Sequence, residues 1–368
     1  MNAARRDFQF LALCATAPGS PLLGDRLRTA AERLSAEDWR RLAAFADGHG
    51  MAPLLEAHLR AANITPPEPV ADWLRARTAQ HAHANRVRAT VLAEILTALQ
   101  AAGIEALVLK GAALAHIAYP SPGLRPMGDV DVLVSRKRVR EAQALLARLG
   151  FDAPVPGGLP PKHLPPARRT VEGVEVVVEL HYNLYERGSP ATALEALQPD
   201  ALPFSLPGVT AYTLGHEAML DHLYFHMRHA SFVFRILTTA DMVMWAERFV
   251  AEIEWSRVSP QARHALAMWY WLTPFSPQLV EAAAIETCAP PRGVGLEFDG
   301  WPRHSLAAQR HKGLWGILHD TFFPSEWWVR LYYGLPDGPA LWWGRLVRHP
   351  LWVFGWVLHY FRHRALKS

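Results

Sequence analysis

The run D-V-D-V-L-V at residues 129–134 constrains the fold more than any other segment of the chain. Polar and apolar residues alternate at period two along its first half, which is typical of a strand with two unlike faces. Side chains two residues apart on a strand point to the same side. The sequence therefore predicts a sheet from which Asp129 and Asp131 project together while Val130 packs inside.

The sequence around this run predicts an α/β unit. Upstream, residues 104–109 form a short apolar run that predicts a buried strand, ended by Lys110 and Gly111 at the start of a helix. Downstream, Ser135 is the expected N-cap of a helix that Gly150 closes. Residues 171–180 are rich in β-branched residues and predict a hairpin or one long strand.

Helical spacing dominates both sides of this unit. A proline-rich break at 66–69 precedes an expected long helix over 71–102, and Gly103 follows as its C-cap. We therefore predict an α+β protein with a helical region at 1–102, a mixed core at 103–212 and a helical region at 213–368. At the N-terminus, Phe8, Leu11 and Cys14 recur on one helical face, and we favour this helix over a signal sequence.

Composition excludes several classes of protein. The chain has 368 residues, half of them apolar, which is enough for a sizeable core. The only cysteines, Cys14 and Cys288, fit neither a disulfide scaffold nor a thiolate metal site, and a reducing cytosol is the expected compartment. The net charge of +4 suits a phosphate-bearing partner but is too small to predict specific nucleic-acid binding.

The paired aspartates point to a metal. Two carboxylates side by side raise each other's pKa, and a bound divalent cation relieves that repulsion. Mg²⁺ prefers carboxylate oxygens together with water and phosphate, and Mn²⁺ accepts the same ligands. A third carboxylate on a neighbouring strand would complete the site, and Glu179 at the end of V-V-V-E-L-H is the candidate. The alternative is a pair of solvated or capping aspartates.

Three nearby features favour the metal site over that alternative. The strand, turn and helix at L-V-L-K-G-A-A-L would present backbone N–H groups at a helix start, which suits phosphate. Lys110 lies in this turn and Arg125 lies in the loop before the aspartates. For these two, a solvated strand end and a structural ion pair are the respective alternatives.

These motifs together resemble a known family. L-K-G-A-A-L, Y-P-S-P-G-L-R-P-M-G-D-V-D-V-L-V and V-V-E-L-H are similar to the bacterial uncharacterised nucleotidyltransferases of the DNA polymerase β-like superfamily. The resemblance is strong over 105–182 and extends loosely to about 260, where Arg235 and Asp241 fit the pattern. It implies a polymerase β-like core, a small mixed sheet with flanking helices.

The resemblance also implies roles for residues. Asp129, Asp131 and Glu179 become the catalytic carboxylates and the ligands of Mg²⁺ or Mn²⁺. The residues that would hold the NTP are Lys110, Gly111, Ala112, Arg125 and Gly128. Ala112 stands where the superfamily usually has serine or glycine, so a hydroxyl contact to phosphate is absent.

The implied reaction moves an NMP from an NTP to an unidentified acceptor, which could be a small molecule, a peptide or a protein, and releases pyrophosphate. Two alternatives stay open. One is a non-catalytic protein of the same fold that binds a peptide or membrane partner, and the other is a phosphotransferase that uses the same carboxylates.

Histidines and aromatic residues mark two further segments. His222, His226 and His229 fall on one expected helix, where we favour packing or acceptor contacts over zinc because no glutamate follows His222. His181 is expected on the opposite side of its strand from Glu179. Residues 341–364 mix Trp, Phe, Arg and His, which suits either an interfacial helix on an anionic membrane or a protein contact.

Overall fold

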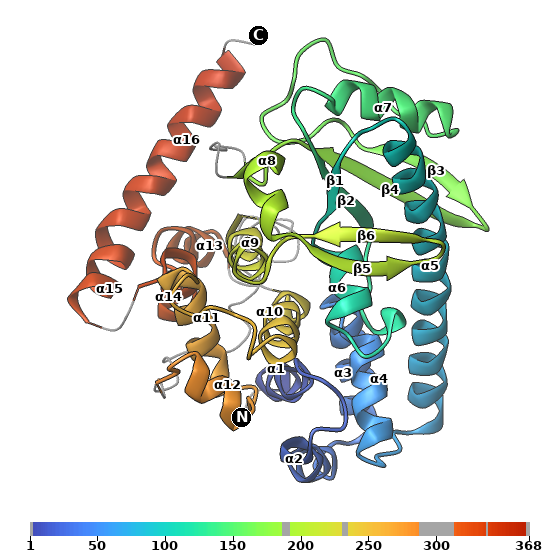
Figure 1. Ribbon diagram of the computed structural model, residues 1–368. Helices are drawn as coiled ribbons and strands as arrows, with labels where there is room; N and C mark the ends of the chain where they lie inside the picture. The colour runs from blue at the N-terminus through green and yellow to red at the C-terminus, as the bar shows by residue number, and fades with distance from the viewer. Residues whose placement is uncertain (1–2, 186–191, 230–234, 287–312, 336–337, 366–368) are drawn as a thin grey trace.

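The computed structural model describes residues 3–185, 192–229, 235–286, 313–335 and 338–365, and it confirms a mixed α+β fold. The first four helices gather at one end of the molecule, the long helix α5 runs from there along the small sheet, and the last helix lies on the side opposite α5 (Figure 1). One continuous hydrophobic core includes residues from all three predicted regions. The boundaries between those regions stay a prediction.

The N-terminal region is helical, as expected. It contains α1 (Ala3–Leu13), α2 (Pro21–Ala31), α3 (Ala36–Gly48), α4 (Ala52–Ala61) and α5 (Glu68–Ala101). Helix α5 begins three residues before the predicted start, with Pro67 as its N-cap and Pro69 within its first turn, where a proline lacks no needed hydrogen bond. Gly103 follows with a φ of +65°, the left-handed conformation expected of a C-cap glycine.

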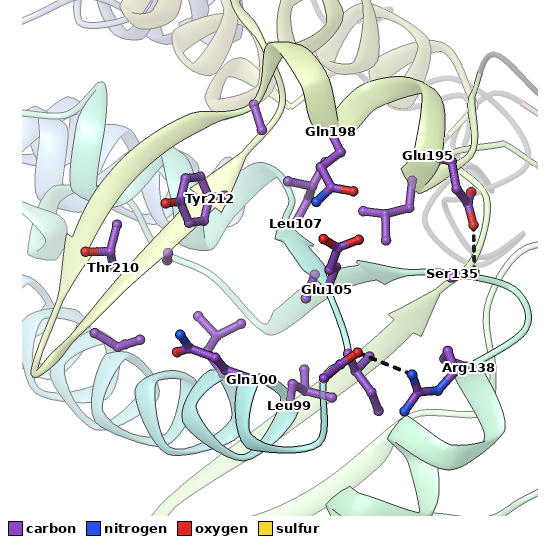
Figure 2. A pocket seen from close by; sticks show the side chains of 18 residues that line it. Leu99, Gln100, Glu105, Leu107, Ser135, Arg138, Glu195, Gln198, Thr210 and Tyr212 are labelled. Carbon is purple, nitrogen blue, oxygen red and sulfur yellow. Dashed lines mark hydrogen bonds between the residues drawn. The ribbon is translucent and has the colours of Figure 1, made fainter.

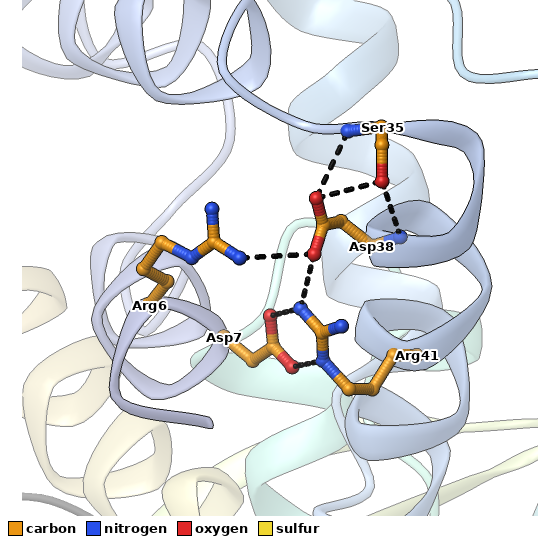
Figure 3. Close-up of polar contacts among 5 residues, drawn as sticks. All are labelled: Arg6, Asp7, Ser35, Asp38 and Arg41. Atoms are coloured by element: carbon orange, nitrogen blue, oxygen red, sulfur yellow. Dashed lines mark hydrogen bonds and ion pairs between the residues drawn. The ribbon is translucent and has the colours of Figure 1, made fainter. Parts of the chain in front are cut away.

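Helix α1 is held to α3 by a buried ion pair. Phe8, Leu11 and Cys14 are buried, as predicted. Asp7 is also buried, and both its oxygens accept hydrogen bonds from Arg41, at 2.6 Å from Nε and 3.2 Å from Nη2. Arg41 also binds Asp38, which forms a reciprocal capping box with Ser35 (Figure 3).

Four strands form the central sheet, in the order β1 (Ala106–Val108), β2 (Asp129–Val134), β4 (Val174–His181) and β3 (Ala167–Val171). Strands β2 and β4 are parallel and the other pairs are antiparallel, so the sheet is mixed. Helices α5 and α7 (Val139–Arg148) pack against β4. Val130 on the neighbouring strand β2 is buried, as predicted. Helix α6 (Lys110–Ile117) and the short η1 (Pro122–Leu124) join β1 to β2.

Two local predictions within the sheet have different outcomes. The predicted hairpin is confirmed: β3 and β4 are joined by Glu172 and Gly173, which both have positive φ, as a tight turn between twisted strands requires. The predicted N-cap at Ser135 is wrong. Its hydroxyl donates to Glu195 instead, and α7 starts after Arg138.

A second hairpin, which the sequence did not predict, lies beside β1. It consists of β5 (Leu202–Leu206) and β6 (Val209–Thr213), preceded by α8 (Leu194–Leu197) and η3 (Gln198–Asp200). The Thr213 hydroxyl donates to the Val108 carbonyl at 2.6 Å and joins this hairpin to the edge of the sheet.

The rest of the described chain is helical, as predicted. The helices are α9 (His216–His229), α10 (Ile236–Arg248), α11 (Pro260–Tyr270), α12 (Pro277–Ala282), α13 (Gly313–Phe322), α14 (Glu326–Tyr333), α15 (Pro339–Trp343), the π-helical turn η6 (Gly344–Arg348) and α16 (His349–Ala365). Across the described residues, no helix combines the length and the apolar character needed to cross a membrane.

Candidate active site

The parallel pairing of β2 with β4 places two acidic residues side by side. In this register Asp131 lies opposite Glu179, and Asp129 lies opposite Val177. Paired residues on neighbouring strands direct their side chains to the same face of a sheet. The structure therefore brings Glu179 beside Asp131, although the two predicted carboxylates lie far apart in sequence.

Asp131 is the centre of this cluster. It is only 3% exposed, yet a lysine and a histidine hold it: Lys110 Nζ lies 2.9 Å from Oδ2, and His181 Nε2 lies 2.7 Å from Oδ1. Burial alone would raise the pKa of Asp131, but the charge of Lys110 and the His181 hydrogen bond hold it well below its usual value. Asp131 is therefore a buried, charge-compensated carboxylate.

His181 belongs to the cluster, and its predicted orientation is wrong. Residues 179 and 181 are two apart on one strand, so their side chains share a face. His181 Nε2 lies 3.6 Å from Glu179 Oε2. Burial opposes protonation of His181, but the bond to Asp131 raises its pKa above the usual value, and in turn His181 lowers the pKa of Glu179.

Asp129 lies at the exposed start of β2. Its pKa is raised because its carboxyl group is partly removed from water and stands near the charge of Asp131. Ligand atoms of Asp131, Glu179 and His181 all lie within 4.8 Å of one another, close enough to share one ion. Asp129 is not part of that closest set. The donor atoms, two carboxylates and an imidazole with a third carboxylate nearby, fit a divalent cation.

The turn before α6 presents Lys110 to Asp131. Lys110 has a φ of +43°, a left-handed conformation that costs a residue with a side chain about 1–3 kcal/mol. The first N–H groups of any helix have no partner within it and form a positive end. The start of α6 therefore combines those N–H groups with a lysine beside the acidic cluster, while Ala112 is buried in the core.

Arg125 forms a structural ion pair in this structure. Its Nη2 lies 2.7 Å from Asp241 Oδ2 and its Nε lies 3.1 Å from Oδ1, while Tyr119 donates to the same carboxylate at 2.7 Å. A Cβ at Gly111 would collide with the Arg125 guanidinium. The structure thus gives Gly111 a packing role and joins the loop before β2 to α10. Gly128 is exposed, with open space around it.

Sequence reasoning missed Arg88 on α5. This side chain is half-buried, its Nε has no hydrogen-bond partner, and its charge interacts with that of Asp129. Burial lowers the pKa of Arg88, and Asp129 partly offsets that effect. No motif marked it, because its approach depends on how the long helix lies against β2.

His222 lies on the other side of the cluster, on α9. It is buried, both of its ring nitrogens lack a hydrogen-bond partner, and its ring lies 5.9 Å from that of Tyr185 and 6.3 Å from that of His226. Burial and the charge of Lys110 hold the pKa of His222 well below its usual value. The side chain of His229 and the stretch 230–234 lie outside the described residues, and Arg235 is exposed.

A separate hollow of about 730 Å³ opens between α5, β1 and β6 (Figure 2). Leu99, Glu105 and Tyr212 are among its lining residues, and none of the acidic cluster lines it. Ser135, at the end of β2 away from Asp129, is also part of its wall. The hollow is therefore distinct from the site at the acidic cluster.

Comparison with known proteins gives one family. A family model described as "uncharacterised nucleotidyltransferase" matches residues 35–267. No curated protein matches the chain. Among solved structures, an antigenic nucleotidyltransferase-like protein from Paracoccidioides brasiliensis is similar at 19% identity and a TM-score of 0.36, over 55% of this chain and 94% of that one.

Proposed function

Because the chain belongs to the family of uncharacterised nucleotidyltransferases, we propose that it transfers an NMP from an NTP to an acceptor at the Asp131 cluster. A single observation carries the proposal. Asp131 is buried between Lys110, which begins α6, and His181, and it lies beside Glu179. A structural ion pair needs one cation, whereas this site gathers three carboxylates, a lysine and a histidine at one end of the sheet.

Asp129, Asp131 and Glu179 would hold the divalent ion, Mg²⁺ or Mn²⁺. Each carboxylate oxygen has more than one lone pair, so Asp131 can bind Lys110 and His181 and still coordinate a metal. His181 acts as a positioning residue that fixes the orientation of Asp131. When bound, the ion supplies charge stabilisation for the oxygens of the reacting phosphate.

The triphosphate would lie against the start of α6. The N–H groups of the first helical turn can donate to an anion, and Lys110 near Asp131 and Arg88 near Asp129 add positive charge. Gly128 leaves open space next to Asp129. In this arrangement Arg125 packs against Gly111 and donates to Asp241. It would therefore position the turn that binds phosphate instead of contacting the phosphate itself.

The acceptor would enter from the α9 side. A hydroxyl or other nucleophile of the acceptor attacks the α-phosphorus, its proton passes to a base, and the bond to the leaving pyrophosphate breaks. Glu179 is the base we assign, because its carboxylate lies beside Asp131 and can accept a proton from a nucleophile at the cluster. His222 offers ring nitrogens without partners to a polar group of the acceptor or the nucleoside.

The activity is tested by following a radiolabelled phosphorus atom of the NTP. Protein is incubated with Mg²⁺ or Mn²⁺ and each NTP, radiolabelled either at the α-phosphorus or at the γ-phosphorus, together with a cell extract as the source of acceptors. Nucleotidyl transfer moves the α-label to an acceptor and releases the γ-label as pyrophosphate. A phosphotransferase instead moves the γ-label and leaves the nucleoside diphosphate.

The matched variants are Asp131→Asn, which we expect to abolish transfer, and Asp25→Asn, an exposed aspartate paired only with Arg28, which we expect to have no effect. Equal transfer by the two variants would exclude the proposed site. Absence of any transfer by the wild-type protein, with every NTP and both metals, would contradict the activity itself.

A further inference from the structure

The last described segment of the chain carries an apolar surface that the proposed reaction does not use. Helix α15, the π-helical turn η6 and α16 follow one another without a break from Pro339 to Ala365. On them Trp343 is 63% exposed, Leu351 67% and Phe354 56%. We name the surface formed by Trp342, Trp343, Leu346, Leu351, Phe354 and Leu358 the C-terminal apolar face.

The opposite side of the same helices holds them to the body. Leu341, Gly344, His349 and Val353 are buried. His349 Nε2 lies 2.9 Å from the Thr321 carbonyl, and its Nδ1 lies 2.9 Å from the Tyr333 hydroxyl. The segment is therefore docked along a narrow stripe, and its large apolar side chains point away from that stripe.

The π-helical turn aligns the exposed residues. In an α-helix, residues three or four apart share a face. The buried stripe advances from Gly344 to His349, and the apolar face from Leu346 to Leu351, so both take a step of five residues across η6. A π turn inserts this extra residue. Without it, Trp342 and Trp343 would be rotated away from Leu351 and Phe354, and the face would be divided.

Charge indicates what covers this face. From Gly338 to Ser368 the sequence has no Asp or Glu but has four arginines and a lysine. Arg345 and Arg348 lie in η6, where Arg345 lies 3.8 Å from Glu326 and Arg348 lies over the Tyr333 ring. Contact between two copies through this surface would bring like charges together, which costs free energy. Tryptophan beside arginine on an exposed helix suits the headgroup level of an anionic bilayer.

We propose that the C-terminal apolar face docks the protein on an anionic lipid surface, with the helices lying in the plane of the interface. Apolar side chains then enter the boundary between headgroups and acyl chains, and the net positive charge of the segment attracts it to anionic lipid. The face provides the exposed aromatic and aliphatic side chains that this docking requires, and the buried stripe of the same helices keeps the rest of the molecule attached.

The test is flotation of the full-length protein with vesicles of phosphatidylcholine, with and without about 30% phosphatidylglycerol, since anionic lipid attracts basic segments. We expect flotation with the anionic vesicles, and a loss of at least about tenfold in partitioning on neutral vesicles or in about 0.5 M salt. The variant Leu351→Glu/Phe354→Glu should lose at least about tenfold in binding to anionic vesicles.

The control is Val155→Glu, which introduces one glutamate at an exposed apolar residue in the loop before β3 and should float like the wild type. Circular dichroism of each variant verifies that it is folded. Failure of the wild type to float, or unchanged flotation of Leu351→Glu/Phe354→Glu, would overturn the proposal. A concentration-dependent dimer that this variant abolishes, without vesicle binding by the wild type, would assign the face to a second copy instead.

Discussion

At the scale of single residues, Asp131 is the position on which the site depends. A carboxylate that is buried must be compensated, and here Lys110 and His181 provide the compensation without a metal. The left-handed backbone at Lys110 is the local distortion that directs its side chain to Asp131. The same lysine that compensates Asp131 in the folded state is the one we propose for contact with phosphate.

Removing only Lys110 should destabilise the fold. In Lys110→Met, Asp131 stays buried with His181 as its only cationic partner, and we expect the free energy of unfolding to fall by about 2–4 kcal/mol. The double variant Lys110→Met/Asp131→Asn removes both charges and should regain at least about 1 kcal/mol of that loss. Urea unfolding of both variants measures the coupling free energy between Lys110 and Asp131, with Lys137→Met, at an exposed lysine, as the control. Purely additive effects of the two substitutions would contradict an interaction between these residues.

Two glycines near the site should differ in their tolerance of a side chain. Gly111→Ala adds a Cβ that collides with Arg125, which cannot move freely because it binds Asp241, so we expect a loss of about 1–3 kcal/mol. Gly128→Ala meets open space and should change stability by less than about 0.5 kcal/mol. Thermal unfolding compares them. Equal stability would show that the Arg125 guanidinium can move away from residue 111.

At the scale of elements, some parts of the structure followed from sequence and others did not. The strand Asp129–Val134 was predicted because its period-two pattern is local. The β5–β6 hairpin was missed, since its short strands carry Pro203 and Ser205 and gain their place from contacts with β1. The prediction that Ser135 caps a helix was wrong because its hydroxyl donates a hydrogen bond to Glu195, which lies 60 residues away in sequence.

The candidate site divides in the same way. Glu179 was predicted as the third carboxylate on a neighbouring strand, and the strand register places it opposite Asp131. The position of His181 could have been predicted, because residues two apart on a strand share a face. The sequence held the information, and the prediction applied it wrongly. The packing of distant helices determines the positions of Arg88, His222 and the Arg125–Asp241 pair. No local pattern in the sequence predicts that packing.

The packing of α1 on α3 should depend on one arginine. Arg41→Ala leaves Asp7 buried without its bidentate partner, and we expect a loss of about 2–3 kcal/mol in the free energy of unfolding. Arg75→Ala breaks an exposed pair with Asp72 and should cost less than about 0.5 kcal/mol. Denaturant titration of both variants compares a buried with an exposed pair, and equal losses would argue against the role assigned to Asp7.

At the scale of the whole molecule, one core joins the N-terminal helices, the sheet and the C-terminal helices. Buried histidines should make its stability depend on pH. Burial lowers the pKa of His58, so the folded protein holds it neutral, and its Nε2 lies 2.9 Å from the Thr16 carbonyl. A lowered pKa in the folded state contributes stability that is complete above the unfolded pKa of about 6.5 and is lost as the pH falls below it.

His58→Gln should therefore reduce the loss of stability between about pH 7.5 and 5.5. The difference between wild type and variant is the quantity to measure, because the raised pKa of His181 acts in the opposite direction: its contribution is complete below about 6.5 and is lost as the pH rises. Urea titrations at several pH values give this difference. A variant whose stability follows the wild-type pH profile would contradict a neutral, buried His58.

The most direct test of the central claim is calorimetric titration of each NTP into the protein, with and without Mg²⁺. We predict binding by the wild type and by Asp25→Asn that requires Mg²⁺, and no such binding by a folded Asp129→Asn/Asp131→Asn variant. Magnesium-dependent binding of the same affinity in that variant would contradict a nucleotide and metal site at the acidic cluster.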